Sequence, residues 1–117
     1  MKRDNFIKGR VGEIMAKKYL EDLGWKTIDQ NFYTRWGEVD LIMDDGEKLV
    51  FVEVKYKGGA NWGRPEDMIG PHKLRQIKLT AGLFLERHPE LKGKFSSFRI
   101  DAVCISQEIK HYRNIGG

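Results

Sequence analysis

The sequence has few of the residues that hold small domains together by covalent or metal links. Cys104 is the single cysteine among 117 residues, which excludes an intrachain disulfide, and the three histidines are scattered, which makes a structural zinc site unexpected. Apolar runs such as Leu49–Val52 fall far short of the roughly 20 residues that span a bilayer. No charged-then-apolar segment typical of a signal peptide opens the chain. We therefore expect a cytoplasmic protein with no membrane association.

The remaining composition is typical of a folded domain. Hydrophobic residues make up 40% of the chain and charged residues 32%, which excludes a disordered acidic segment and a fibrous repeat. A chain of 117 residues has room for one modest hydrophobic core. We expect residues 1–117 to form a single domain.

The net charge of +4 is distributed unevenly along the chain. Residues 1–18 and residues 55–78 each carry six Lys or Arg against two acids, whereas residues 19–54 carry nine acids against three bases. A plain nucleic-acid binder gains nothing from an acidic centre, because each carboxylate near phosphate weakens binding. An enzyme that holds both a divalent cation and a polyanion needs both kinds of segment. Chance unevenness of surface charge is the alternative interpretation.

The hydrophobic pattern predicts a helix, three strands, a second helix and two further strands. Apolar residues recur at helical spacing, and turn or β-branched residues mark the strands. The expected helices cover residues 4–23 and 71–88, and the expected strands cover 25–34, 37–43, 48–56, 98–106 and 109–115. Asp45-Gly46 predicts a hairpin turn, and the glycine-rich segment 57–70 predicts a long functional loop. Because a helix joins the third and fourth strands, we expect an α/β fold with a mixed five-stranded sheet.

Two carboxylates and a lysine are expected on one face of the predicted hairpin. A two-residue turn at Asp45-Gly46 would place Asp40 opposite Phe51 and diagonally across from Glu53. Lys55 follows Glu53 by two residues and would share that face. The pair ends an apolar run that we expect to be buried on both faces, and a buried charge needs a partner or a metal. An ordinary solvent-facing strand edge is the competing interpretation.

This arrangement suits a magnesium site. Mg²⁺ prefers oxygen ligands, takes few of them from protein and completes its octahedral shell with water. Asp40, Glu53 and the backbone carbonyl of Val54 would supply such ligands, and Mn²⁺ would substitute for Mg²⁺. Lys55 would then orient or deprotonate an attacking water and balance phosphate charge.

Several sequence blocks resemble known proteins. Asp40, followed by Glu53-Val54-Lys55 after an apolar strand, resembles the Asp…(Asp/Glu)-x-Lys signature of the restriction-endonuclease-like nucleases. The longer blocks resemble those of the bacterial YraN family, which is similar to archaeal Holliday-junction resolvases. These blocks are Gly9–Glu13 with Ala16 and Tyr19-Leu20, Gly24-Trp25 with Asn31, Gly37–Ile42, Val50–Lys55, Arg99–Val103 and His111–Asn114. A proline often precedes the first acidic residue of the nuclease signature, and Val39 stands there, as in the Gly-Glu-(Ile/Val)-Asp form of the YraN family.

The resemblance implies a restriction-endonuclease-like fold, in which helices flank a central mixed sheet. It implies Asp40 and Glu53 as magnesium ligands and Lys55 as the catalytic lysine. It also carries over Glu13 as the helix-borne carboxylate that completes the metal site. Glu38 is left open between a further ligand and a satisfied structural acid, and the second interpretation is favoured.

Basic side chains in both basic segments are candidates for contacts with DNA. Arg10 lies in the first segment, Arg64 in the glycine-rich loop, and Lys73 in the first turn of the second helix, where it also resembles a basic family position. A solvated helix face and loop tip is the alternative interpretation. Elsewhere, Asp101 is expected to pair with Arg99 or to bind backbone amides, and Cys104 is expected in the core.

The expected function is that of a metal-dependent DNA endonuclease, with a preference for branched or structured DNA and without a small-molecule cofactor. A C2 homodimer is the simplest way to supply two sites for paired cuts. Two alternatives remain open, a catalytically idle DNA-binding protein and a protein-interaction module that keeps the nuclease fold. The intact acids Glu13, Asp40 and Glu53 with Lys55 favour the enzyme, because an idle site has no need of a destabilising charge cluster.

Overall fold

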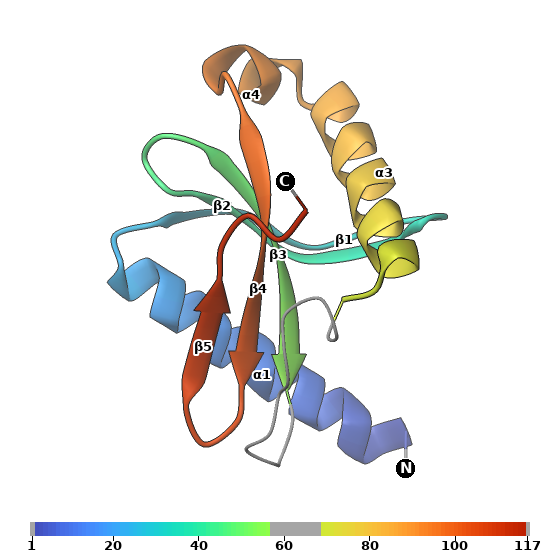
Figure 1. The fold of residues 1–117 in the computed structure, drawn as a ribbon, viewed down its shortest axis with the longest axis vertical. Coiled ribbons are helices and arrows are strands. Elements are labelled where there is room, and N and C mark those ends of the chain that lie inside the picture. Colours follow the sequence, from blue (N-terminus) through green and yellow to red (C-terminus); the bar gives the residue numbers. More distant parts are fainter. Residues whose placement is uncertain (1, 57–68, 117) are drawn as a thin grey trace.

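The computed structural model of the chain describes residues 2–56 and 69–116 (Figure 1). In chain order its elements are α1 (Lys2–Asp22), β1 (Lys26–Thr34), β2 (Gly37–Asp44), β3 (Leu49–Tyr56), α3 (Pro71–Arg87), α4 (Pro89–Lys94), β4 (Phe98–Ile105) and β5 (Ile109–Tyr112). All seven helices and strands expected from the sequence are confirmed, with boundaries that differ by a few residues. None of the helices described is long and apolar enough to cross a membrane.

The five strands form one mixed sheet in the order β1-β2-β3-β4-β5. Neighbouring strands pair antiparallel except β3 and β4, which run parallel. The parallel pair follows from the connection, because a chain that returns through α3 and α4 re-enters the sheet in the same direction. The α/β class and the mixed five-stranded sheet are confirmed, and the arrangement is consistent with a restriction-endonuclease-like fold.

Each face of the sheet carries its own hydrophobic cluster. On the face covered by α1, the buried residues are Ala16, Leu20, Trp25, Leu41, Met43, Val50, Val52, Val103 and Ile105. On the face covered by α3, they are Val39, Ile42, Leu49, Phe51, Ile69, Ile77, Ala81, Phe84, Ile100 and Ala102. The run Leu49–Val52 alternates between the two clusters with each residue 0% exposed, so β3 is buried on both faces, as its unbroken apolar sequence predicts.

The β2–β3 turn is centred one residue later than the sequence predicts. Asp45 N–H binds the Lys48 carbonyl at 3.1 Å, so the two turn residues are Gly46 and Glu47, and Gly46 supplies a φ of +96°. The Asp45 carboxylate stabilises this turn by accepting hydrogen bonds from the N–H groups of Glu47 at 2.8 Å and Lys48 at 2.6 Å. The strand register therefore moves by two residues.

The new register corrects one sequence-based expectation. Phe51 pairs with Ile42, not with Asp40, and the last pair of the β2–β3 ladder is Leu41 with Val52. Asp40 and Glu53 are the residues that come next on each strand beyond this pair. The two carboxylates therefore flank the point where the ladder ends, whereas the sequence placed Glu53 diagonally from Asp40 within a continuous pair.

Two features of the C-terminal half escape the sequence pattern. Helix α4 has six residues and none is buried, so no apolar periodicity marks it. Strand β5 ends at Tyr112, three residues before the predicted limit, because Asn114 turns the chain with a φ of +55° and its N–H binds Asp101 Oδ1 at 3.0 Å. Both differences concern short segments.

Candidate functional site

The candidate site lies where β2 and β3 separate. Beyond Leu41 and Val52 the ladder stops, and Asp40 Oδ2 accepts a hydrogen bond from the N–H of Val54 at 2.7 Å. A side chain thus takes the place of a backbone ladder bond. Figure 1 shows the consequence, because the β1–β2 hairpin turns away while β3 continues beside β4. The opening between the strands admits side chains from elements on either side of the sheet.

Strand β2 is distorted at Asp40. In a regular strand, residues two apart point to the same face, yet Val39 packs in the α3-side cluster and Leu41 in the α1-side cluster. The neighbouring strand is also irregular, because Asn31 has a φ of +53° and its pairing with Asp40 is missing from the β1–β2 register. An asparagine is among the residues that best tolerate this conformation. The side chains of β2 therefore do not alternate regularly between the two faces of the sheet at this position. The sequence-based placement of Glu38 and Asp40 depended on that alternation.

Three carboxylates from two elements converge beside this distortion. Glu13 on α1 and Glu38 and Asp40 on β2 each offer one oxygen, and these oxygens lie within 4.8 Å of one another. Asn31 joins two of the acids, because its Nδ2 donates to both Glu13 oxygens at 3.0 Å and to Glu38 Oε1 at 3.1 Å. Glu38, which the sequence left open, is therefore a member of this cluster by position.

Glu53 lies on the other side of the opening, among cations. It is 6% exposed, and its Oε1 is 3.8 Å from Lys73 Nζ and 4.0 Å from Lys55 Nζ. Its Oε2 is buried without a hydrogen-bond partner, the one such side-chain oxygen or nitrogen among the described residues. A buried carboxylate oxygen without a partner costs folding free energy that a bound cation would recover. Glu53 therefore has one carboxylate oxygen that is available as a ligand atom.

The acids of the site destabilise one another as charges. Burial, the nearby Glu53 charge and a hydrogen bond with Glu38 raise the pKa of Asp40 to about 9, against the lowering effect of the Val54 N–H. Burial also raises the pKa of Glu53, although Lys73 and Lys55 oppose this rise. Without further positive charge, Asp40 is therefore protonated at neutral pH. A site that holds a proton in this way releases it when a divalent cation binds.

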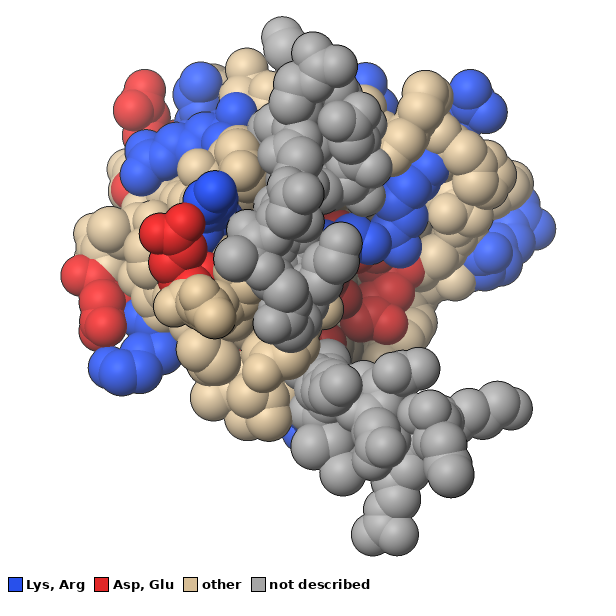
Figure 2. All heavy atoms as spheres, turned by 60° about the horizontal axis from the view of Figure 1, so that its bottom comes forward, with Lys and Arg blue, Asp and Glu red and all other residues tan. Residues whose placement is uncertain are grey.

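The donor set fits magnesium. Hard carboxylate oxygens from Glu13, Glu38 and Asp40 are the ligand type that Mg²⁺ prefers. Glu53 is close enough for its charge to act on Asp40, but it is not one of the acids whose oxygens lie within 4.8 Å of one another. In Figure 2, one of several groups of acidic atoms on the face toward the viewer has Lys and Arg atoms directly beside it. The carbonyl of Val54 stays a prediction as a ligand, since the observed contact of Val54 with the site is made through its N–H.

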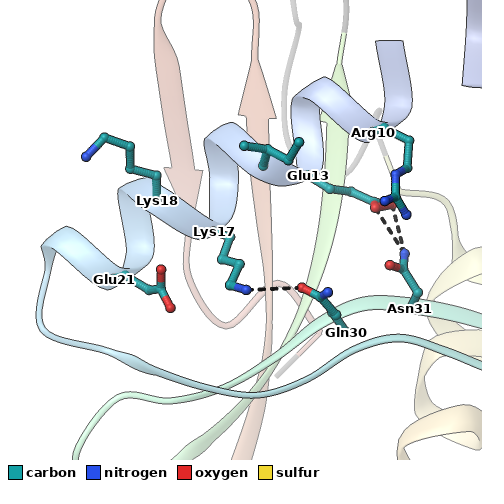
Figure 3. A pocket seen from close by; sticks show the side chains of 8 residues that line it. Arg10, Glu13, Lys17, Lys18, Glu21, Gln30 and Asn31 are labelled. Carbon is teal, nitrogen blue, oxygen red and sulfur yellow. Dashed lines mark hydrogen bonds between the residues drawn. The ribbon is translucent and has the colours of Figure 1, made fainter. Parts of the chain in front are cut away.

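The three basic residues predicted to contact DNA lie in different places. Arg64 and most of the glycine-rich loop lie outside the described residues. Arg10 is exposed on α1 and lines a pocket together with Glu13 (Figure 3). Lys73, expected from the sequence to contact DNA, also pairs with Glu53 and so belongs to the same site as Lys55. Sequence reasoning missed this role of Lys73, and it named Asn31 only as part of the family resemblance, because the contacts with Glu53 and Glu13 cross 20 and 18 positions of the sequence.

The sequence-based interpretation of Asp101 and Cys104 is confirmed. Asp101 is fully buried and accepts hydrogen bonds from Arg99 Nε at 2.9 Å and from the Asn114 N–H at 3.0 Å. It also contacts His111 Nε2 at 2.8 Å. These bonds lower the pKa of Asp101 despite its burial. Cys104 is fully buried, and burial raises the pKa of its thiol to about 11.

Comparison with known proteins identifies the family. The family model described as uncharacterised protein family UPF0102 matches residues 12–105, which include every acid of the candidate site. A UPF0102 protein of Aliivibrio salmonicida is 41% identical over 111 residues, covering 92% of this chain and 89% of the relative. A UPF0102 protein of Persephonella marina is 37% identical over 110 residues, with coverage of 94% and 93%. A UPF0102 protein of Rhodococcus opacus is 38% identical over 116 residues, with coverage of 94% and 96%.

These similarities extend over nearly the whole length of both the chain and its relatives, at identities far above chance. The chain therefore belongs to the UPF0102 family, which is the YraN family that its sequence blocks resemble.

Proposed function

We propose that the protein is a metal-dependent DNA endonuclease that hydrolyses phosphodiester bonds. One observation carries the proposal: a three-carboxylate cluster adjoins a buried carboxylate, Glu53, that has an unpartnered oxygen and two lysines. A fold has no structural need for such a concentration of unfavourable charge. Phosphodiester hydrolysis needs these parts, because it requires a divalent cation, an activated water and positive charge near the phosphate.

The acids have the role of ligands in this proposal. Glu13, Glu38 and Asp40 would hold Mg²⁺ or Mn²⁺ together with Glu53, and water would complete the coordination shell. When bound, the cation supplies Lewis-acid activation of phosphate and water. Asn31 fixes the Glu13 and Glu38 carboxylates in place by donating to both. The Val54 N–H orients Asp40 in the same way.

The two lysines provide the positive charge. Lys55 and Lys73 lie at nearly equal distances from Glu53 Oε1, and their side chains are 36% and 38% exposed. Each Nζ is thus anchored near the acids and accessible to a ligand from solvent. Lys55 would orient the attacking water, as its place in the signature implies, and Lys73 would balance charge on the phosphate.

The proposed substrate is DNA, with preference for branched or structured forms. Basic residues flank the acidic centre of the chain, and no base-reading module is visible in the sequence, so binding through the phosphate backbone is the mode that this charge pattern supports. Paired cuts in a branched substrate need two sites, which a C2 homodimer would provide. The proposed location is the cytoplasm, in keeping with a single buried cysteine.

The proposal is tested by incubating the purified protein with four-way junction, flap, single-stranded and duplex DNA, in Mg²⁺, in Mn²⁺ and in EDTA. We expect cleavage that requires the metal and favours a branched DNA. Asp40→Asn, purified in parallel, is the matched control for contaminating nuclease and should be inactive. Binding of DNA by the wild type without cleavage in either metal would contradict the endonuclease and support a nuclease-fold DNA-binding protein. The absence of both DNA binding and cleavage would support a protein-interaction module.

A further inference from the structure

A charged groove runs along α1 from the carboxylate cluster. It encloses about 400 Å³ between α1 and β1, with Arg10, Lys17 and Lys18 on the helix wall and Gln30 and Asn31 on the strand wall (Figure 3). The lining residues of α1 extend from Arg10 to Glu21 at spacings of three and four, so they share one face of the helix. At a rise of about 1.5 Å per residue, this face is about 16 Å long.

The groove and the carboxylate cluster share side chains. Glu13 and Asn31 line the groove, and the same two residues make the hydrogen bonds that organise the cluster. Figure 3 shows them at one end of the groove beside Arg10, with Lys17 reaching across to Gln30 farther along α1. A polymeric ligand with one of its groups bound at the carboxylate cluster can therefore continue directly into the groove.

The lining side chains give the groove a small net positive charge, because Arg10, Lys17 and Lys18 outnumber Glu13 and Glu21. Both Glu13 oxygens accept from Asn31, and Glu21 Oε2 accepts from Thr27 Oγ1 at 3.0 Å, neutral partners on β1 that hold the acids in place without cancelling their charge. Lys17 Nζ donates to the neutral amide of Gln30 at 3.4 Å, a contact that leaves its charge uncancelled. Lys18 instead pairs with Asp22 at 3.3 Å, which offsets its charge. Arg10 and Lys17 are therefore the cations best placed for an anionic ligand.

We propose that the α1–β1 groove binds the sugar–phosphate backbone of the nucleic-acid strand on one side of the bond that is cleaved. The inference rests on the proposed function, because that function puts the reacting phosphate at the carboxylate cluster. Arg10 and Lys17, about 10 Å apart along the helix, contact phosphates about three nucleotides apart, and the Gln30 amide contacts a phosphate or sugar oxygen. Ile14, which is 65% exposed in the same wall, offers an apolar surface to a sugar or base. A groove of about 16 Å matches about five nucleotides at 3.4 Å per nucleotide.

The test measures binding in EDTA, so that it does not depend on the metal or on cleavage. Fluorescence anisotropy of a labelled 20-nucleotide single strand and of a labelled junction is recorded over a series of salt concentrations. We expect Arg10→Gln/Lys17→Gln to bind at least about tenfold more weakly at low salt. Its log–log salt slope on the single strand should fall by about 1.4, since each lost phosphate contact removes about 0.7. Lys18→Gln should have a smaller effect than Lys17→Gln because of its pairing with Asp22.

The matched control is Lys92→Gln, an exposed lysine on α4 that does not line the groove. It removes one positive charge from the protein and should leave the salt slope unchanged. A second readout reports contact directly, because Ile14→Cys bearing a photoactivatable azidophenacyl group should cross-link to the DNA, and Lys92→Cys with the same label should not. All these side chains are exposed or at the rim of the groove, so the variants should fold.

The outcomes separate this inference from the proposed function. One outcome would overturn the proposed role of the groove and leave the endonuclease proposal intact. In it, the wild type cleaves DNA in a metal-dependent way, and Arg10→Gln/Lys17→Gln binds DNA with the affinity and salt slope of the wild type. A reduced slope and an Ile14 cross-link in a protein that never cleaves DNA would support the groove and contradict the endonuclease. Equal slope losses in the Lys92 control and the double variant would also overturn the groove, because they would indicate a diffuse charge effect.

Discussion

The Asp40 carboxylate on β2 accepts a hydrogen bond from the Val54 N–H on β3 at 2.7 Å, just where the backbone ladder between these strands has ended. Near this bond, Glu13 from α1 lies close to the β2 acids and Lys73 from α3 lies 3.8 Å from Glu53 on β3. Burial, the Glu53 charge and Glu38 raise the pKa of Asp40, and the Val54 N–H acts against that rise. The carboxylates gathered where the strands separate thus make one another's charge unfavourable.

Asp40→Asn is expected to stabilise the metal-free protein at pH 8. The pKa of Asp40 is about 9 in the folded protein, against 3.8 as its ordinary value, so the unfolded chain binds fewer protons between these values. Stability of the wild type should therefore fall as the pH rises from 4 toward 9, and Asn, which mimics the protonated acid, should remove that loss. We expect a gain of at least about 1.4 kcal/mol, the value of one pKa unit.

Thermal unfolding in EDTA at pH 5 and at pH 8 checks this prediction, with exposed Glu47→Gln as the control. The advantage of Asp40→Asn should grow between the two pH values, while the control should follow the wild type. Added Mg²⁺ or Mn²⁺ should raise the melting temperature of the wild type but not that of Asp40→Asn. An Asp40→Asn protein less stable than the wild type at pH 8 would contradict the assignment of Asp40 as a buried, unfavourable charge.

Asn31 is expected to contribute to stability through its backbone conformation and to metal affinity through its side-chain amide. Its φ of +53° favours Asn or Gly, and its Nδ2 bridges Glu13 and Glu38. Asn31→Ala loses both properties, whereas Asn31→Gly keeps the backbone freedom and loses only the bridge. We expect Asn31→Ala to unfold with about 1 kcal/mol less free energy than Asn31→Gly. Both variants should lose metal affinity by about 10- to 100-fold, measured by Mn²⁺ titration, because the acids are no longer oriented.

Equal stability of the Ala and Gly variants would contradict the backbone argument. Unchanged Mn²⁺ affinity in both would contradict the role of the amide. The exposed neighbour Gln30, replaced by Ala, is the control for a general effect of changes in β1, and it should leave metal affinity unchanged.

The buried Asp101 is expected to be a main determinant of stability. It is 0% exposed and bonded to Arg99, His111 and Asn114. Asp101→Asn breaks a buried charged network and should cost about 3–5 kcal/mol, measured by urea unfolding at pH 7. Because the folded pKa of Asp101 is lowered from 3.8, its contribution is complete above about pH 4 and is lost as the pH falls through the folded value.

The surface pair formed by His88 and Glu90 gives the comparison, since Glu90→Gln should change the free energy of unfolding by less than about 1 kcal/mol. A cost for Asp101→Asn as small as that of Glu90→Gln would show that the network is dispensable. Asp101 lies outside the candidate site, so residual metal binding by the folded fraction of Asp101→Asn should match the wild type.

Periodicity and apolar runs were sufficient to predict every strand and both long helices. Leu49–Val52 is a clear case, because four consecutive apolar residues predict a strand buried on both faces, which β3 is. The register of the β2–β3 hairpin was not predictable in the same way. Asp45-Gly46 signals a turn, but the carboxylate bonds of Asp45 to two later N–H groups decide where its centre lies. These bonds depend on side-chain geometry that the dipeptide does not encode.

The residues of the candidate site also divide into those that local sequence patterns predicted and those that they did not. Asp40, Glu53 and Lys55 were found because a charged segment that ends a buried strand is anomalous in the sequence. Glu38 could be named but not placed, since the distortion at Asp40 breaks the alternation on which any such placement depends. Asn31 and Lys73 contact the acids across gaps of 18 and 20 positions, and local patterns do not encode such contacts.

Lys55 and Lys73 are expected to differ in function although both contact Glu53. Lys55→Ala should abolish DNA cleavage, since this lysine is the one proposed to orient the water, and should leave junction binding in EDTA within about threefold of the wild type. Lys73→Ala should retain weak cleavage, because its proposed role is to balance charge. Replacement of both should raise the pKa of Glu53, since the two lysines are what lowers it.

Two measurements distinguish these roles from a merely structural one. Lys73→Arg keeps the charge and should restore most of the cleavage lost in Lys73→Ala. Lys55→Arg should stay inactive, because the planar guanidinium does not place its N–H groups where the compact ammonium orients the water. Thermal unfolding should remain close to that of the wild type in all four single variants, since both side chains are more than a third exposed. Full cleavage by Lys55→Ala would remove Lys55 from the mechanism, and inactivity of Lys73→Arg would mean that Lys73 does more than balance charge.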